Sequence, residues 1–293
     1  MSFLRRLLAS VCNKISPRKA DYLAADDDVV YAHASAGGFA HLVHDQLGQR
    51  AYPSEGRVAR MALGPMFAEI IGMHDATLLL CSGGRAPLTT LLFRTMLEFW
   101  ANAAVITSAG EDADYMAFKY LHHFLLVAAK DEDLPPESQT SSENQFREAM
   151  AKLPVHLQQR LEALLSADHA PRYWYSPELK GPSQAFAKIE GEDLYPSFRR
   201  FSAGVHAAFP GTGIFKDHPD QHHPFPRRDR QAQNLALLYA AWCLTEFAML
   251  RARFDKVNVK AYYSALREQQ RHLRDRVQGP WDTLAAPPST GED

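Results

Sequence analysis

The chain has 293 residues, of which 46% are hydrophobic and 23% charged, and its 32 basic and 34 acidic side chains give a formal net charge of −2. This composition is typical of a globular protein and excludes a collagen-like or intrinsically disordered chain. A charge this close to zero also excludes a global attraction to nucleic acid, so any such binding must come from a local patch. The three cysteines are too few and too scattered for a disulfide framework or a cysteine zinc site, which favours a reducing, cytoplasmic location.

Residues 1–25 are expected to form an amphipathic segment ahead of the folded domain. Within it, residues 2–15 place Arg5, Arg6 and Lys14 around an apolar centre that is too short for the core of a secretory signal. Two interpretations stay open for this segment. It is either a docked first helix, which is the commoner case, or a reversible anchor at a membrane surface.

From residue 26 onward the hydrophobic periodicity is helical, and no stretch sustains a two-residue alternation. The sequence therefore predicts an all-α fold, with one multi-helix bundle domain over residues 26–279 and a flexible tail over residues 280–293. Prolines and polar or aromatic residues predict irregular loops at 131–145, 170–183 and 211–228. The predicted helices cover residues 26–49, 54–82, 87–107, 111–130, 154–165, 196 to no later than 210, 230–254 and 261–277.

The segment at about 87–107 is apolar on nearly every face, which predicts the central helix of the bundle. It is also the only segment that we expect to approach the length of a membrane span. Arg94 and Glu98 lie near its middle, and each charge would cost about 2.5–3.5 kcal/mol in a bilayer. We therefore predict a buried helix and no stable membrane insertion.

Arg94 and Glu98 are four residues apart, so they share one face of this helix. The favoured interpretation is a buried ion pair, or a pair bonded to neighbouring helices, that fixes how the bundle packs. The alternative is functional, because charged pairs also gather at sites, and the two side chains would then form the polar floor of a cleft.

A second polar face is predicted where residues 195–206 form a helix. Tyr195, Arg199, Ser202 and His206 are three, four or seven residues from one another and project together. A guanidinium can hold a phosphodiester, and an imidazole can move a proton to or from a ribose hydroxyl. The structural alternative is that Ser202 bonds to the helix backbone and that His206 is a half-buried polar residue.

Basic side chains gather at two further places, the end of the loop at 216–230 and the last two helices. Between residues 251 and 276 there are eight basic and three acidic side chains, whereas residues 111–148 carry nine acidic and three basic ones. A solvated helix surface is the default interpretation, and a local patch that contacts RNA is the functional one. The predicted nucleic-acid contacts are Arg227, Arg228, Arg267, Arg271 and Arg274.

The loop at 216–230 also contains His218, His222 and His223, beside two aspartates. These types of side chain can bind a metal ion, but a helical HExxH pattern is absent and flexible histidine loops often bind metals adventitiously. We therefore predict no metal and no cofactor. A metal-dependent hydrolase stays open as a third functional alternative.

Two stretches resemble a bacterial helical family known as domain of unknown function 5677. The first is LLFRTMLEFW, which carries Arg94 and Glu98 after a glycine-containing turn. The second is LYPSFRRFSAGVH, with Trp174 upstream of it. The resemblance covers roughly residues 55–215, and the family has no settled activity to carry over.

The second stretch is also similar to the HEPN ribonucleases, which are small helical domains. Their signature has four to six residues between an arginine and a histidine, and here six residues separate Arg199 from His206 and five separate Arg200 from it. The residue after that arginine is often polar in HEPN proteins, whereas Phe201 follows Arg200 here. The similarity implies metal-independent cleavage of RNA by a homodimer, with Arg199 on the phosphate, His206 as general acid or base, and Tyr195 and Ser202 positioning the substrate.

A different class of function also remains open after these resemblances. The chain could be a helical binding or regulatory module without catalytic activity. Arg94, Glu98 and His206 would then form a buried polar network that specifies packing.

Overall fold

The computed structural model describes residues 23–49, 56–189, 194–205 and 230–277. Every regular element within these ranges is a helix, which confirms the predicted all-α fold. The chain divides into two compact units, which are described separately below. Unit 1 takes residues 1–50, 66–100 and 193–293, and unit 2 takes residues 51–65 and 101–192.

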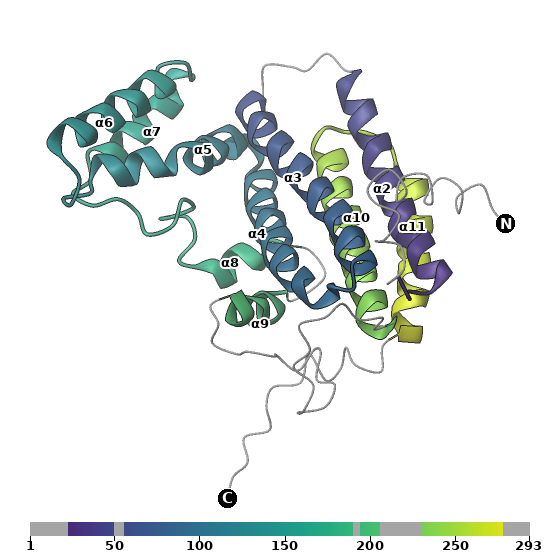
Figure 1. Cartoon of the computed structure of the whole chain (residues 1–293). Helices are drawn as coiled ribbons and strands as arrows, with labels where there is room; N and C mark the ends of the chain where they lie inside the picture. The colour runs from purple at the N-terminus through teal and green to yellow at the C-terminus, as the bar shows by residue number, and fades with distance from the viewer. Residues whose placement is uncertain (1–22, 50–55, 190–193, 206–229, 278–293) are drawn as a thin grey trace, which may run out of the picture. The chain divides into compact units, whose positions relative to one another are not determined.

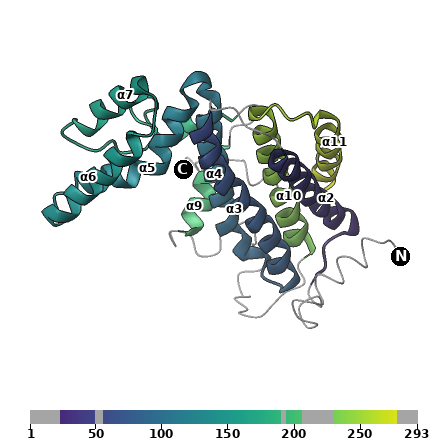
Figure 2. The same ribbon diagram turned by 90° about the horizontal axis from the view of Figure 1, so that it is seen from above.

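Unit 1 is built around α10. In both views α10 lies between α2 and α11 on one side and α3 and α4 on the other (Figures 1 and 2). Helices α3 and α4 continue from this unit into unit 2. The elements of unit 1 are α2 (Asp27–Gly48), α3 (Arg57–Ser82), the 3-10 turn η2 (Ala86–Leu88), α4 (Thr89–Ser108), α9 (Tyr195–Val205), α10 (Arg230–Phe254) and α11 (Lys260–Val277).

Helix α10 is the most buried of the described helices, with 18 of its 25 residues buried. The helix predicted at 87–107 is present as α4, but it reaches the surface, where Leu91 is 46% exposed. Because aromatic rings bury much area, they carry a large share of this core. Phe67 and Phe247 lie with ring centroids 5.8 Å apart, Phe93 and Tyr239 4.7 Å apart, and Trp100 and Trp242 5.1 Å apart.

The helix that is long and apolar enough to cross a membrane is also α10, by length and composition alone, among the described residues. The expectation that residues 87–107 are the only such segment is therefore wrong. Within the structure, 83% of the apolar window of α10 is buried against its own unit. This burial is the behaviour of a core helix.

The start of α2 is fastened to α10 by side-chain amides. The backbone N–H of Ala24 donates to Oε1 of Gln233 at 2.8 Å, and that of Asp26 donates to Oδ1 of Asn234 at 2.8 Å. Both amide side chains are buried, so these bonds are shielded from water. Arg276 of α11 also bonds to Asp26, so three helices meet at this end of unit 1.

Unit 2 contains the part of the chain that we predicted to be a polar loop at 131–145, and that prediction is wrong. Most of the segment belongs to α6, which Pro136 begins at the first helical position, where its missing N–H costs nothing. Phe146 and Met150, four residues apart, are the buried residues of α6, and the ring of Phe146 meets Phe118 at a centroid distance of 5.3 Å. The elements of unit 2 are η3 (Gly110–Asp112), α5 (Ala113–Ala129), α6 (Pro136–Met150), α7 (Val155–Leu165) and α8 (Pro182–Phe186), besides the adjoining parts of α3 and α4.

The connection at 170–183 is irregular and packed, as its composition predicts. Trp174 is buried there, and its Nε1 donates to Oδ1 of Asn102 at 3.1 Å. The other predicted loop, at 211–228, lies outside the described residues. So do residues 1–22 of the N-terminal segment and the tail at 280–293.

Candidate functional site

Helices α4 and α9 meet through one guanidinium group. Nε of Arg94 donates to Oγ of Ser202 at 3.1 Å, and its guanidinium carbon lies 5.5 Å from the ring centroid of Phe198. Nη2 of the same side chain lies 3.6 Å from Oε2 of Glu98. The polar pair of α4 and the polar face of α9 therefore form one cluster, which we call the Arg94 cluster and define as Arg94, Glu98, Phe198 and Ser202.

The ion pair in this cluster forms as the four-residue spacing predicts, but it is not buried. The Arg94 side chain is 27% exposed and that of Glu98 47% exposed. An ion pair that is this open to solvent typically contributes about 0.2–1 kcal/mol. Packing of α4 against α9 is therefore fixed more by the bond to Ser202 and the stack on Phe198 than by the ion pair.

Two other predicted residues of α9 differ in their surroundings. Tyr195 is half-buried, and its ring lies 6.4 Å from that of Phe198 with 20° between their planes. Arg199 is exposed. The oxygen of Ser202 accepts a hydrogen bond from Arg94, and its own O–H can still donate to a substrate. His206 lies outside the described residues.

Sequence reasoning missed Phe198, although its spacing could have identified it. Phe198 lies three residues after Tyr195 and four before Ser202, so all three fall on one helical face. An aromatic ring under a guanidinium holds that group by a cation–π contact. This contact, with the bond to Ser202, holds the Arg94 side chain against α9.

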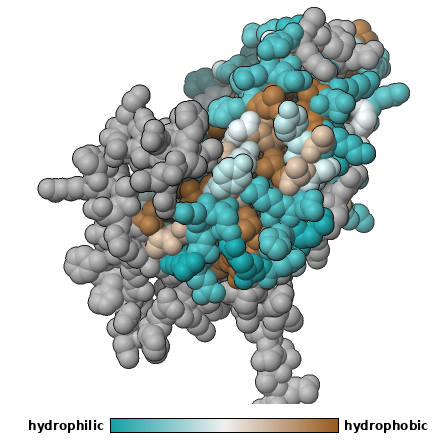
Figure 3. Space-filling view, turned by 90° about the vertical axis from the view of Figure 1, so that its right-hand side faces the viewer, coloured by the Kyte–Doolittle hydropathy of each residue, from teal (hydrophilic) through white to brown (hydrophobic). Residues whose placement is uncertain are grey.

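The predicted basic contacts on α11 are of two kinds. Nε of Arg267 pairs with Oε1 of Glu246 at 2.9 Å, and the hydroxyl of Tyr263 donates to the same carboxylate at 3.0 Å. Burial and the nearby negative charge of Glu246 raise the pKa of Tyr263, which keeps that hydroxyl a donor. Arg271 and Arg274 are exposed. The face of the molecule drawn in Figure 3 is largely hydrophilic around a narrower apolar band.

The histidine loop and its basic end lie outside the described residues. Within the ranges that the structure describes, no three histidine, cysteine, aspartate or glutamate side chains gather in a way that could hold a metal ion. The predicted residues that fall outside those ranges are His218, His222, His223, Arg227 and Arg228.

A second polar cluster lies within unit 2, around a buried lysine. Nζ of Lys119 donates to the backbone oxygen of Ser176 and to the carboxylate of Glu178. Burial lowers the pKa of Lys119, and the Glu178 carboxylate opposes that shift. Burial, with the charge of Glu178 next, raises the pKa of Tyr115 to about 12, and Arg160 covers that ring at 3.9 Å. These groups bond to one another, so the cluster clamps the 170–183 connection onto α5.

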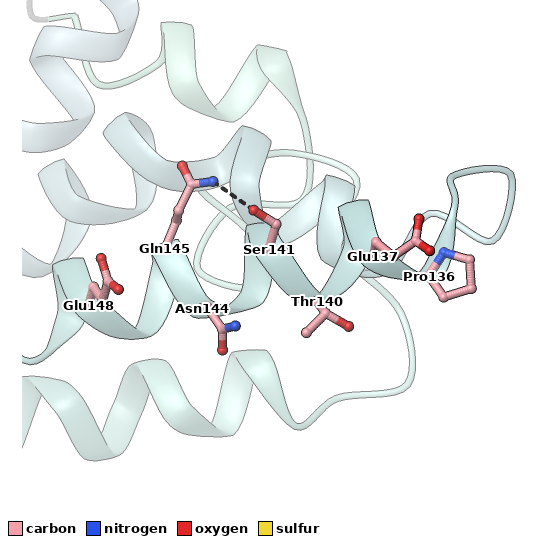
Figure 4. Close-up of a pocket in the computed structure, with 7 residues that line it drawn as sticks. All are labelled: Pro136, Glu137, Thr140, Ser141, Asn144, Gln145 and Glu148. Atoms are coloured by element: carbon pink, nitrogen blue, oxygen red, sulfur yellow. Dashed lines mark hydrogen bonds between the residues drawn. The ribbon is translucent and has the colours of Figure 1, made fainter.

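A hollow follows the exposed side of α6, in unit 2 (Figure 4). Within it, Nε2 of Gln145 donates to Oγ of Ser141 at 3.3 Å. A single helix supplies the whole lining, and none of the residues predicted from the sequence belongs to it. The lining residues are Pro136, Glu137, Thr140, Ser141, Asn144, Gln145 and Glu148.

Comparison with known proteins identifies a family but no characterised relative. No curated protein and no solved structure matches the chain. Residues 60–222 match a family of unknown function, DUF5677, and this range is more than half of the chain. It includes all of the Arg94 cluster and the stretches that suggested the resemblance. The chain therefore belongs to the DUF5677 family of unknown function.

Proposed function

We propose that this protein is a helical effector that binds RNA along α9 and cleaves it without a metal ion. The observation that carries the proposal is that α9 has two guanidinium groups at it. Arg199 is exposed on α9 itself, and Arg94 of α4 donates a hydrogen bond to Ser202 of α9. Glu98 offsets part of the charge of Arg94, so Arg199 is the group that would hold a phosphate. Arg94 would attract the phosphate more weakly than Arg199 does.

The chemistry assigned to His206 follows from its place in the sequence. It comes four residues after Ser202, the spacing that shares a face on a helix. Its imidazole would take the proton of a ribose 2′-hydroxyl, and the 2′ oxygen would attack the adjacent phosphorus. The bond from phosphorus to the 5′ oxygen would break, and that oxygen would take a proton from water, while the imidazolium returns its proton to solvent. The products would be a 2′,3′-cyclic phosphate and a 5′-hydroxyl. No metal ion is needed, because the nucleophile belongs to the RNA.

Cleavage assays test this proposal. Purified protein, without a His tag, is incubated with RNA and with DNA of the same sequence, both in EDTA. We expect cleavage of RNA alone, and loss of that cleavage in His206→Ala. The control is His41→Ala, which changes an exposed histidine of α2 and should leave cleavage intact.

Three results would contradict the proposal: no cleavage by the unaltered protein, equal cleavage by His206→Ala, or cleavage of DNA. Cleavage that appears only after a divalent metal is added back would instead favour the metal-dependent hydrolase.

A homodimer and a cytoplasmic location belong to the same proposal. In HEPN ribonucleases, which the α9 stretch resembles, dimerisation brings two such helices together. The two described cysteines, Cys81 and Cys243, are free and buried, and burial raises the pKa of the Cys81 thiol to about 12. Such thiols are unreactive, which agrees with the reducing compartment inferred from the cysteine pattern.

The second candidate is a helical binding or regulatory module without catalytic activity, and the Arg94–Ser202 bond favours it. In this case the Arg94 cluster serves to fix α9 on α4. Arg94→Ala and Ser202→Ala are each expected to lower the free energy of unfolding by about 1 kcal/mol, because each breaks the same partly shielded hydrogen bond. Their combined effect in the double variant should fall short of the sum.

Urea denaturation of the two single variants and the double variant measures this coupling. Thr95→Ala is the matched control, since the Thr95 hydroxyl bonds to the backbone of its own helix. Effects that are near zero and additive would exclude the structural role. Coupled losses of stability in a protein that cleaves no RNA would identify the binding module.

A further inference from the structure

Two histidines far apart in the sequence are stacked inside unit 1. His33 of α2 and His74 of α3 are 41 residues apart, and both are buried. Their ring centroids are 3.6 Å apart, with 8° between the ring planes. Because the two stacked imidazoles are shielded from water, adding a positive charge to the pair is energetically unfavourable.

Each ring is fixed by a hydrogen bond to the other residue's backbone. Nε2 of His33 lies 3.1 Å from the carbonyl oxygen of His74, and Nε2 of His74 lies 3.0 Å from the carbonyl oxygen of His33. A carbonyl oxygen can only accept, so both Nε2 atoms must carry a hydrogen. The contact is therefore reciprocal and ties α2 directly to α3.

Space for the pair comes from a glycine one turn after His33. A Cβ atom at Gly37 would lie 3.3 Å from Cε1 of His74, which is closer than ordinary contact. The missing side chain lets the His74 ring lie against the backbone of α2.

Few charged groups reach this pair. Among the described residues, His74 is the electrostatic partner of His33, and neither α10 nor α11, which both pack on α2, adds a charged group that shifts the pKa of His33. On α3, Asp75 Oδ1 lies 3.2 Å from Nδ1 of His74, and the Asp75 side chain is largely exposed. No described carboxylate favours a proton on His33.

We propose that His33 and His74 form an acid-sensitive clasp between α2 and α3, which holds while His33 is neutral and opens when His33 takes up a proton. Opening places the charged ring in water and relieves the cost of holding a positive charge in a buried, stacked position. The proposal does not depend on the RNA activity, because it concerns how two helices of unit 1 are held.

The direction of the pH dependence follows from burial. Burial, and then the charge of His74, hold the pKa of His33 well below its usual value of 6.5. When α2 is open to water, His33 regains that ordinary value. The open form therefore binds more protons below pH 6.5, so the clasp is fully stable above pH 6.5 and weakens as the pH falls. The opening equilibrium should rise by about tenfold for each pH unit below 6.5, down to the pKa of the closed form.

Amide hydrogen exchange on the full chain measures the opening. After correction for the intrinsic exchange rate, the opening constant of α2 is compared at pH 7.5 and pH 5.5. We expect a rise of about tenfold in the unaltered protein. The glutamine of His33→Gln can still donate a hydrogen bond to the His74 carbonyl oxygen but cannot take up a proton. The opening constant of this variant should therefore be nearly the same at pH 7.5 and pH 5.5. His41→Gln, which changes an exposed histidine of α2, should retain the full rise.

An unchanged opening constant in the unaltered protein, or an equal rise in His33→Gln, would overturn the clasp. If His33→Gln does not fold, the imidazole ¹⁵N spectrum of the unaltered protein provides the test. His33 should then stay in its neutral, Nε2-protonated form at pH 5.5, one unit below the usual pKa of 6.5. Protonation of His33 at or above pH 6.5 in the folded protein would overturn the proposal.

Discussion

Replacing Arg251 with methionine is expected to lower the free energy of unfolding by about 3–5 kcal/mol. Nε of Arg251 lies 2.8 Å from Oδ2 of Asp255, the residue that follows the end of α10, and the two side chains are only 6% and 0% exposed. Methionine retains most of the apolar stem but removes the positive charge. The Asp255 carboxylate then stays buried without its charge partner, which is the costly outcome.

Urea denaturation of Arg251→Met measures this loss, and two further variants separate charge from packing. The double variant Arg251→Met/Asp255→Asn should recover much of the stability, because no uncompensated charge remains. Arg147→Met is the matched control: Arg147 pairs with Glu143 and Glu162 at the surface, so its loss should cost less than about 1 kcal/mol. Equal losses of unfolding free energy in Arg251→Met and Arg147→Met would show that burial of the Arg251–Asp255 pair does not change its effect on stability.

Helices with a strong apolar stripe could be predicted from the sequence. The range 230–254 agrees with α10, and 261–277 agrees with α11 to within one residue at its start. The apolar periodicity and the flanking polar segments define such helices without tertiary information. By contrast, α6 was predicted as a loop because Phe146 and Met150, its buried residues, both lie near its end. Its polar first half carries no periodic signal, and its prolines fit a loop as well as the first turn of a helix.

The position of α10 at the centre was not predicted, although its sequence carries a local signal for it. The longest uninterrupted apolar run of the two segments is Leu235–Leu244 in α10, whereas the run at 87–107 is broken by Arg94 and Glu98. In the structure α10 is the helix that α2, α3, α4 and α11 surround. How many neighbours pack on an apolar helix is a property of the tertiary fold.

The candidate site, too, could be predicted only in part from the sequence. Spacing along one helix predicted the Arg94–Glu98 pair, and it also placed Ser202 on the face of α9 that turns out to meet α4. The bond from Arg94 to Ser202 joins residues 108 positions apart, which no periodicity can reveal. The stacked pair of His33 and His74 is hidden for the same reason. Each histidine alone resembles an ordinary polar residue in an amphipathic helix.

Phe247→Ala is expected to lower the free energy of unfolding by about 3–5 kcal/mol. Phe247 is completely buried in α10, and its ring stacks on Phe67 of α3 with 17° between the planes. Truncation removes the transfer free energy of the ring and leaves a cavity that helices on several sides cannot readily close. Phe247→Leu, which keeps most of the volume, should cost less than about 2 kcal/mol.

This substitution also tests whether α10 is a core helix or a helix that crosses a membrane. Composition alone fits a helix that crosses a membrane as well as one packed inside a protein, and only the packed helix makes stability in water depend on Phe247. Phe124→Ala is the matched control, because Phe124 is 65% exposed on α5 and its loss should change stability by about 0.5 kcal/mol or less. Urea denaturation that gave the same small loss for both variants would contradict a core position for α10. A large loss for Phe247→Ala alone requires that its ring is enclosed by the neighbouring helices when the chain is folded in water.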